Sequence, residues 1–283
     1  MQSSNPVFAR SATFNGRGTT HAGAGRSPGY SDPSTWSIGS PGAPAGGPSA
    51  PTQVGGGRIT IDSVVQKTAA TLGLLVASAA VTWLLIGDIT ASDANLQRAQ
   101  MFALVGVFGG FGLAMVNSFK RVISPALVLA YSVVQGMAIG AVSLIFETLY
   151  PGVVMGAVVG TTAAFAGTLA VYKIFDIKVT SKFRRGVMAA MFGFVGLAML
   201  DLVLSFFGAD FGFNGFGTLG LITSIAGVIL GVLMLILDFD FVERAIAAGA
   251  PERESWRAAF GLTVTIVWIY IEMLRILAIL RGD

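Results

Sequence analysis

Cysteine is absent from the 283 residues, histidine occurs once, and only 12% of the residues are charged. Without cysteine the chain can form no disulfide, no zinc–thiolate centre and no cysteine nucleophile. A soluble globular domain carries about 25% charged residues, so this chain has about half the usual charge to place on a surface in water. The hydrophobic content of 54% agrees with this deficit. The composition therefore favours a membrane protein over a soluble enzyme.

The only histidine, His21, lies in a polar segment of residues 1–57 that is dominated by Gly, Ser, Pro, Ala and Thr. Such a segment buries too little apolar surface to offset the entropy lost on ordering, so we expect a disordered cytoplasmic tail. It lacks the apolar core of a signal peptide. No catalytic triad, phosphate-binding loop or paired metal-ligand motif is found in the sequence, so we expect neither an enzyme nor a bound cofactor.

Seven apolar stretches of 19 to 24 residues follow in residues 58–283. A helix needs about 20 residues to cross a hydrocarbon core roughly 30 Å thick, whereas strands are much shorter. Continuous apolar runs must satisfy their backbone polar groups internally, which only a helix does. The sequence therefore predicts an all-α integral membrane protein, a seven-transmembrane-helix bundle. The predicted helices are 64–87, 99–117, 125–146, 151–171, 186–207, 216–237 and 258–280.

The basic residues are divided unequally between the two sets of helix ends. The end at which the first helix begins carries twelve, and the opposite end carries only Arg98 and Arg281. The positive-inside rule then predicts a cytoplasmic N-terminus and, with seven helices, an external C-terminus. We read these residues as topology signals and expect no nucleic-acid partner. The twelve are Arg58, Lys67, Lys120, Arg121, Lys173, Lys178, Lys182, Arg184, Arg185, Arg244, Arg253 and Arg257.

Several predicted helices carry glycines four residues apart. In lipid this spacing lets helix backbones approach closely. Packing within the bundle and a homodimer face are both compatible with it. The glycines are Gly106 and Gly110; Gly136 and Gly140; Gly152, Gly156 and Gly160; and Gly227 and Gly231.

Ionisable groups away from the helix ends are the most informative residues of the chain. One such group at the bilayer centre costs about 2.5 to 3.5 kcal/mol, so it must face protein or water. Glu272 lies 14 residues past Ala258, roughly 21 Å along the last helix. Arg275, three residues further on, is a possible charge partner that would make Glu272 purely structural. Otherwise Glu272 is a carboxylate in a solvated pathway.

The sixth helix ends in Asp238-Phe-Asp240-Phe, and the fifth contains Asp201. Asp238 and Asp240 are about 200° apart on a helix and cannot both face one site. Asp240 has Arg244 four residues later as a partner in a solvated pair, whereas Asp238 lies deeper. We therefore expect Asp238 to be the acid that meets Glu272. Asp201 is a secondary candidate.

These features resemble the Bax inhibitor family (transmembrane Bax inhibitor motif proteins) in its bacterial YccA-like branch. The resemblance rests on seven helices with a cytoplasmic N-terminus, the aspartate motif after Leu237, and Trp268-Ile-Tyr-Ile-Glu272, where the family has Tyr-Leu-Asp. Three departures are the glutamate in place of aspartate, the absence of the Asp-Thr-Gln sequence, and a longer connection between the last two helices.

The resemblance implies a paired-carboxylate pH sensor that regulates a slow calcium leak. Glu272 matches the member on the last helix, and Asp238 or Asp240 matches the member on the sixth helix. Asp238 and Glu272 would then contact the transported calcium. The alternative is an interaction factor that grips a membrane-bound protease through the tail. A proton-coupled transporter would use the same acids, but we find no inverted repeat.

Overall fold

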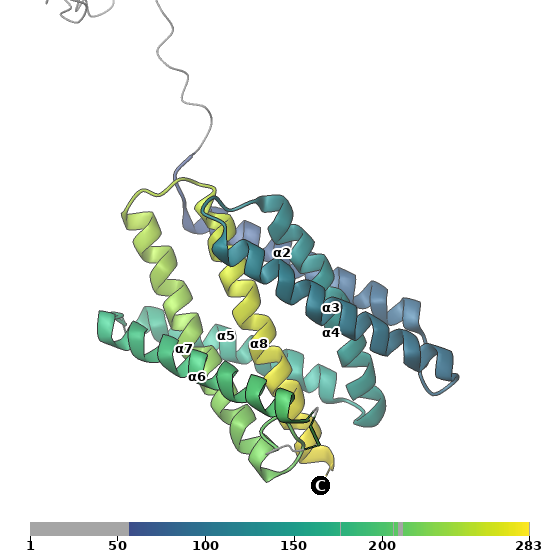
Figure 1. The fold of residues 1–283 in the computed structure, drawn as a ribbon. Helices are drawn as coiled ribbons and strands as arrows, with labels where there is room; N and C mark the ends of the chain where they lie inside the picture. The colour runs from purple at the N-terminus through teal and green to yellow at the C-terminus, as the bar shows by residue number, and fades with distance from the viewer. Residues whose placement is uncertain (1–56, 176, 206, 209–211, 283) are drawn as a thin grey trace, which may run out of the picture. The chain divides into compact units, whose positions relative to one another are not determined.

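The structure is a computed structural model that describes residues 57–175, 177–205, 207–208 and 212–282. The predicted disordered tail, residues 1–57, lies outside the described residues except for Gly57. The described chain folds into seven helices, each long and apolar enough to cross a membrane, so the predicted fold class is confirmed (Figure 1). They are α2 (Ile61–Ile86), α3 (Asp93–Phe119), α4 (Pro125–Leu149), α5 (Val153–Ile174), α6 (Ser181–Ser205), α7 (Thr218–Ala247) and α8 (Glu254–Gly282).

The last two helices are longer than their apolar stretches. α7 continues ten residues beyond Leu237, through Asp238 and Asp240, and α8 begins four residues before Ala258. Hydropathy marks where a chain leaves the hydrocarbon, whereas a helix can continue into water when its charged residues are paired or solvated. The acids of both helices therefore lie within regular helix and have fixed directions.

The two prolines predicted at helix starts differ. Pro125 is the first residue of α4, where its missing N–H costs nothing. Pro151 lies before α5, because Gly152 adopts a left-handed conformation with φ of 84° and the helix starts at Val153. The predicted start of this helix was therefore two residues too early.

Helices α4 and α8 are the most buried of the seven. α4 packs against α2 and α3, and α8 packs against α7, α5, α2 and α4. Figure 1 shows α8 running between α7 on one side and the group of α2, α3 and α4 on the other. α6 packs mainly on α7 and is the least buried helix. α8 is thus the element that joins the two halves of the bundle.

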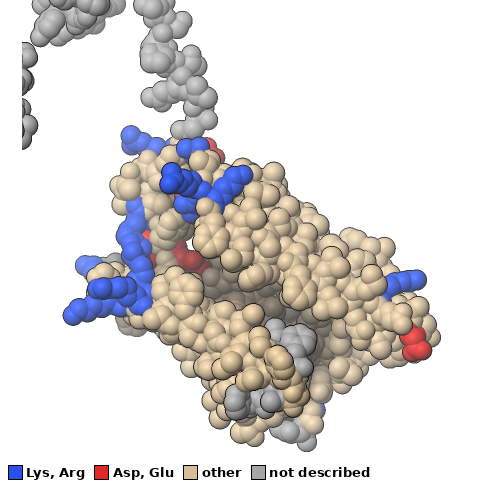
Figure 2. Space-filling view, viewed as in Figure 1, with Lys and Arg blue, Asp and Glu red and all other residues tan. Residues whose placement is uncertain are grey.

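The loops at the end where α2 begins are tied together. The Ile59 N–H donates to the Ala250 carbonyl at 2.9 Å, and the Lys67 ammonium lies 2.9 Å from a Glu252 carboxylate oxygen. The Arg257 guanidinium donates to the Arg121 carbonyl at 2.8 Å. In Figure 2 the basic side chains are concentrated toward this end of the bundle. The basic residues from which the charge asymmetry was predicted therefore lie mostly at the end of the bundle where α2 begins.

Glycines at the predicted spacing lie at helix contacts within the chain. A Cβ on Gly106 would come within 2.6 Å of the Ala138 backbone, and one on Gly140 would overlap the Ala79 carbonyl. A Cβ on Gly231 would overlap the packing position of Ile269. The expectation of close packing inside the bundle is confirmed for these glycines.

The glycine contacts predict a stability difference between two substitutions. Gly140→Ala should lower the free energy of unfolding by about 1 to 3 kcal/mol, because the methyl group overpacks the contact between α4 and α2. Gly73→Ala, on a helix face with open space, should be neutral or slightly stabilising, since alanine favours helix more than glycine does. Thermal loss of the monodisperse species in detergent measures both. Equal melting temperatures for the two variants would contradict the contact.

Candidate functional site

Acidic side chains of α7 and α8 lie inside the bundle. Glu272 is 5% exposed, Asp240 is 8% exposed and Asp238 is partly buried. The two helices are adjacent and antiparallel, so their residues meet in reverse order. Gly227 of α7 lies against Glu272, and Asp238 of α7 lies against Gly261 and Thr265 of α8.

Glu272 occupies the space that Gly227 leaves open. A Cβ at Gly227 would be 2.8 Å from Cδ and 3.0 Å from Cγ of Glu272, so the glutamate would have to shift. The Oε2 atom has no hydrogen-bond partner among the described residues and lies 3.8 Å from Nη2 of Arg275. The expected pair with Arg275 is therefore present, but it is long. Glu272 faces protein, as its cost in lipid requires.

Arg275 makes its short hydrogen bonds to α7 and to the segment before it, not to Glu272. Its Nε donates to Oγ of Ser224 at 2.6 Å. Its Nη2 donates to the Phe213 carbonyl at 3.1 Å and to Oγ1 of Thr223 at 3.3 Å. Three neutral acceptors therefore hold the guanidinium. This arrangement fixes one end of α8 against the start of α7.

Asp238 faces α8, as expected, but it does not meet Glu272. Its carboxylate accepts a hydrogen bond from the Thr265 hydroxyl at 2.7 Å. Asp238 and Gly227 are eleven residues apart on α7, which corresponds to about 16 Å along the axis. The prediction that Asp238 meets Glu272 is therefore wrong. At this separation the two carboxylates cannot bind one calcium ion together, and contact of each with a transported ion stays a prediction.

Asp240 points away from α8. Its carboxylate forms ion pairs with Arg244, one turn later on α7, and with Arg184 of α6 at 3.1 Å. The expected pair with Arg244 is confirmed, and the opposite directions of Asp238 and Asp240 follow from the helical geometry. Asp240 thus anchors α6 to α7 and is far from contact with Glu272.

Asp201 holds the connection between α6 and α7. It is 3% exposed, and its Oδ2 accepts the backbone N–H of Asn214 at 2.9 Å. The Asn214 side chain in turn donates to the Ala198 carbonyl at 3.0 Å. Phe213, next to Asn214, accepts from Arg275, so Asp201 positions a segment that Arg275 also contacts.

The neutral partners of the charged residues were not predicted from the sequence. Thr265 binds Asp238, Ser224 binds Arg275, and Tyr172 of α5 donates to Glu243 at 2.8 Å. Hydroxyl residues are common in membrane helices, so none of them stands out in the sequence. A usable signal was the helical spacing of Thr265 and Glu272, seven residues apart and therefore on one face.

The acids are arranged as single carboxylates at separate depths. Among the described residues no group of three or more acidic or histidine side chains is placed to hold a metal ion. Each carboxylate is instead held by separate neighbours: Asp238 by Thr265, Asp240 by Arg184 and Arg244, and Glu272 at long range by Arg275. Such an arrangement suits transient contacts with a passing cation better than a tight metal cage.

Comparison with known proteins gives one family. No curated protein matches the chain. The family described as Bax inhibitor 1 like matches residues 5–282, nearly the whole sequence. This match agrees with the seven membrane-spanning helices of the structure and with the resemblance carried by the aspartate motif and Glu272. The chain belongs to the Bax inhibitor 1 like family of multi-pass membrane proteins.

Proposed function

We propose that this membrane protein is a slow, pH-sensitive leak pathway for calcium or another hard cation. Carboxylates of α7 and α8 form the pathway, and no catalytic reaction is assigned to the chain. The observation that carries the proposal is the buried Glu272 carboxylate, whose Oε2 lacks a hydrogen-bond donor among the described residues. A hard cation prefers oxygen ligands of this kind.

A purely structural role accounts poorly for Glu272. Structural arginine–carboxylate pairs are short and often bidentate. Here the nearest approach is 3.8 Å, while Arg275 donates to Ser224 at 2.6 Å. An unsatisfied buried carboxylate oxygen is costly, and its presence in an apolar bundle supports a functional role.

Two separate carboxylates support a stepwise pathway in place of a gate made by one pair. Conduction requires sites that bind weakly and in series, so that an ion enters and also leaves. Asp238 and Glu272, about 16 Å apart along α7, are suited to act as successive contacts. Protonation makes either side chain neutral and removes its attraction for a cation. Flux should therefore rise as pH rises.

The proposed orientation of the protein in the membrane places the N-terminus in the cytoplasm. It is supported by the twelve basic residues at the end where α2 begins, against two at the other end. Asp238 then lies toward the cytoplasmic side, and Glu272 lies deeper in the bundle.

Single-cysteine labelling tests this orientation without background, because the natural chain has no cysteine. Ala91→Cys, in the connection between α2 and α3, should react with a membrane-impermeant maleimide in intact cells. Val122→Cys, in the connection between α3 and α4, should react only after the cells are permeabilised. Both residues are exposed. The reverse labelling pattern would overturn the orientation.

Glu272→Gln tests the central residue. Calcium uptake into proteoliposomes should fall roughly tenfold, the effect of losing about 1.4 kcal/mol of stabilisation along the pathway. Arg275 keeps its three neutral acceptors, so the helix contact should survive. Asp62→Asn, an exposed acid in the first turn of α2, is the control and should leave the flux unchanged. Wild-type flux in Glu272→Gln would remove this residue from the pathway. Absence of calcium flux in the natural protein would favour the alternative function, an interaction factor for a membrane-bound protease.

Asp238→Asn distinguishes successive contacts from a coupled pair. Residues more than about 10 Å apart without shared partners act additively in free energy. The double variant Asp238→Asn, Glu272→Gln should therefore reduce the calcium flux by the product of the two single effects. A double variant no worse than either single variant would indicate a coupled pair and would contradict the separation of the two acids.

A further inference from the structure

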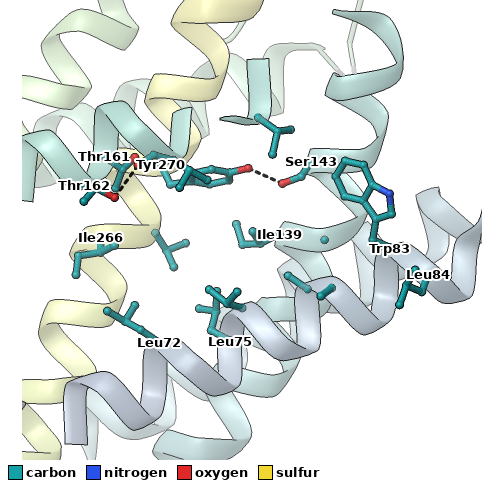
Figure 3. Close-up of a pocket in the computed structure, with 17 residues that line it drawn as sticks. Leu72, Leu75, Trp83, Leu84, Ile139, Ser143, Thr161, Thr162, Ile266 and Tyr270 are labelled. Carbon is teal, nitrogen blue, oxygen red and sulfur yellow. Dashed lines mark hydrogen bonds between the residues drawn. The ribbon is translucent and has the colours of Figure 1, made fainter. Parts of the chain in front are cut away.

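A cavity of about 560 Å³ lies between α2, α4, α5 and α8, outside the group of acids. Its walls are almost entirely apolar and include Leu72, Leu75, Ile139 and Ile266 (Figure 3). The volume is within the range of small-molecule sites, which runs from about 300 to 1,000 Å³. The cavity is therefore large enough for a ligand and not only for a side-chain rearrangement.

The cavity and the acidic residues lie on different faces of α8. Ile266, Val267 and Tyr270 line the cavity, whereas Thr265 and Glu272 face α7. A molecule in the cavity would therefore contact α8 without touching the carboxylates.

The cavity has access from the lipid-facing surface of the bundle. Three of its lining side chains, Val76, Leu84 and Val158, are 63%, 80% and 46% exposed. In a membrane this surface is covered by hydrocarbon, so a ligand would enter laterally from the bilayer.

Two polar groups in the cavity lack full hydrogen bonding. Thr161 is 6% exposed, and its hydroxyl has no hydrogen-bond partner among the described residues. The hydroxyls of Ser143 and Tyr270 are 2.7 Å apart, so one donates to the other and one proton of the pair stays available. In Figure 3 the Tyr270 hydroxyl points toward Ser143, on the side away from Thr161. A buried hydroxyl without a partner costs about 1 to 3 kcal/mol, which a ligand oxygen would recover.

The depth of these hydroxyls excludes a charged ligand group. Thr161 is eight residues from the start of α5, about 12 Å along the helix. Ser143 is six residues from the end of α4, about 9 Å along that helix. Both positions fall within the hydrocarbon region, where an unpaired charge is strongly disfavoured. The group that meets Thr161 must therefore be neutral.

We propose that this cavity binds a neutral lipid that has a hydrocarbon body and one hydrogen-bonding oxygen, a hydroxyl or a ketone carbonyl. The oxygen meets the Thr161 hydroxyl, and the hydrocarbon lies along α2. The acyl chain of a phospholipid would fit the apolar walls, but it would leave the Thr161 hydroxyl unpaired. The Thr161 hydroxyl therefore distinguishes the two occupants.

The test uses photolabelling of the full chain in lipid nanodiscs with a long-chain alcohol that carries a diazirine. Ala80→Phe, which fills the cavity from α2, should abolish most of the specific labelling of cavity residues. Ala77→Phe is the matched control, because Ala77 is exposed on the same helix and does not line the cavity. Equal labelling in the two variants would overturn the proposal.

The hydroxyl is tested with two isosteric substitutions. In Thr161→Val, the concentration of unlabelled alcohol that halves the photolabelling should rise roughly threefold to tenfold, the effect of losing one hydrogen bond. Thr162→Val should have no effect, because the Thr162 hydroxyl already donates to the Val158 carbonyl at 2.8 Å. Both variants keep the side-chain volume, so they remain informative if Ala80→Phe does not fold.

A second probe, a phospholipid with a diazirine in its acyl chain, separates the two occupants. The proposal requires weaker labelling of the cavity by this probe than by the alcohol, with no dependence on Thr161. Stronger labelling by the phospholipid, or identical behaviour of Thr161→Val and Thr162→Val toward the alcohol, would show that the cavity holds only hydrocarbon chains. Neither result depends on calcium flux, so the cavity and the proposed pathway can fail separately.

Discussion

The contact of α7 with α8 at Gly227 and Gly231 is the constraint on which the acidic site depends. Hydrocarbon gives helices no hydrophobic reason to associate, so close contact must come from packing of small residues and from hydrogen bonds. The two glycines admit the side chains of Glu272 and Ile269 directly against the α7 backbone. Arg275 and Trp268 add hydrogen bonds to Ser224 and to the Gly227 carbonyl. Both the burial of Glu272 and its position relative to Asp238 follow from this register.

The two faces of α8 contact chemically different surroundings. Toward α7 it presents Thr265, Glu272 and Arg275, which contact polar groups or glycines. Toward α2 and α5 it presents Ile266 and Tyr270, which line the apolar cavity. The helical period of 3.6 residues makes this separation possible within one sequence.

The sequence was sufficient for the number of helices but not for how they contact one another. Hydropathy and length gave all seven helices because the requirement for internal hydrogen bonds acts on each segment alone. The opposite directions of Asp238 and Asp240 were also predictable, since they depend only on the helical rotation per residue. The pairing of Asp238 with Glu272 was wrong because it depends on the register of two helices, which is set by Gly227, Gly231 and the ten residues of α7 beyond Leu237. The cavity was not predictable, because a lipid-facing leucine and a cavity-lining leucine look the same in a sequence.

The glutamate at position 272 and the glycine at position 227 are best understood as one unit. The Glu272 Cγ and Cδ atoms would contact a Cβ at position 227, so the carboxylate reaches across the interface to the α7 backbone. An aspartate would be one methylene shorter and would end before that backbone. The longer acid therefore requires the glycine, and the glycine leaves a void unless the longer acid is present. Since Arg275 is held by Ser224, Thr223 and the Phe213 carbonyl, it cannot follow the carboxylate without losing these bonds. The long Glu272–Arg275 distance is thus a consequence of two side chains from one helix being held at different places on its neighbour.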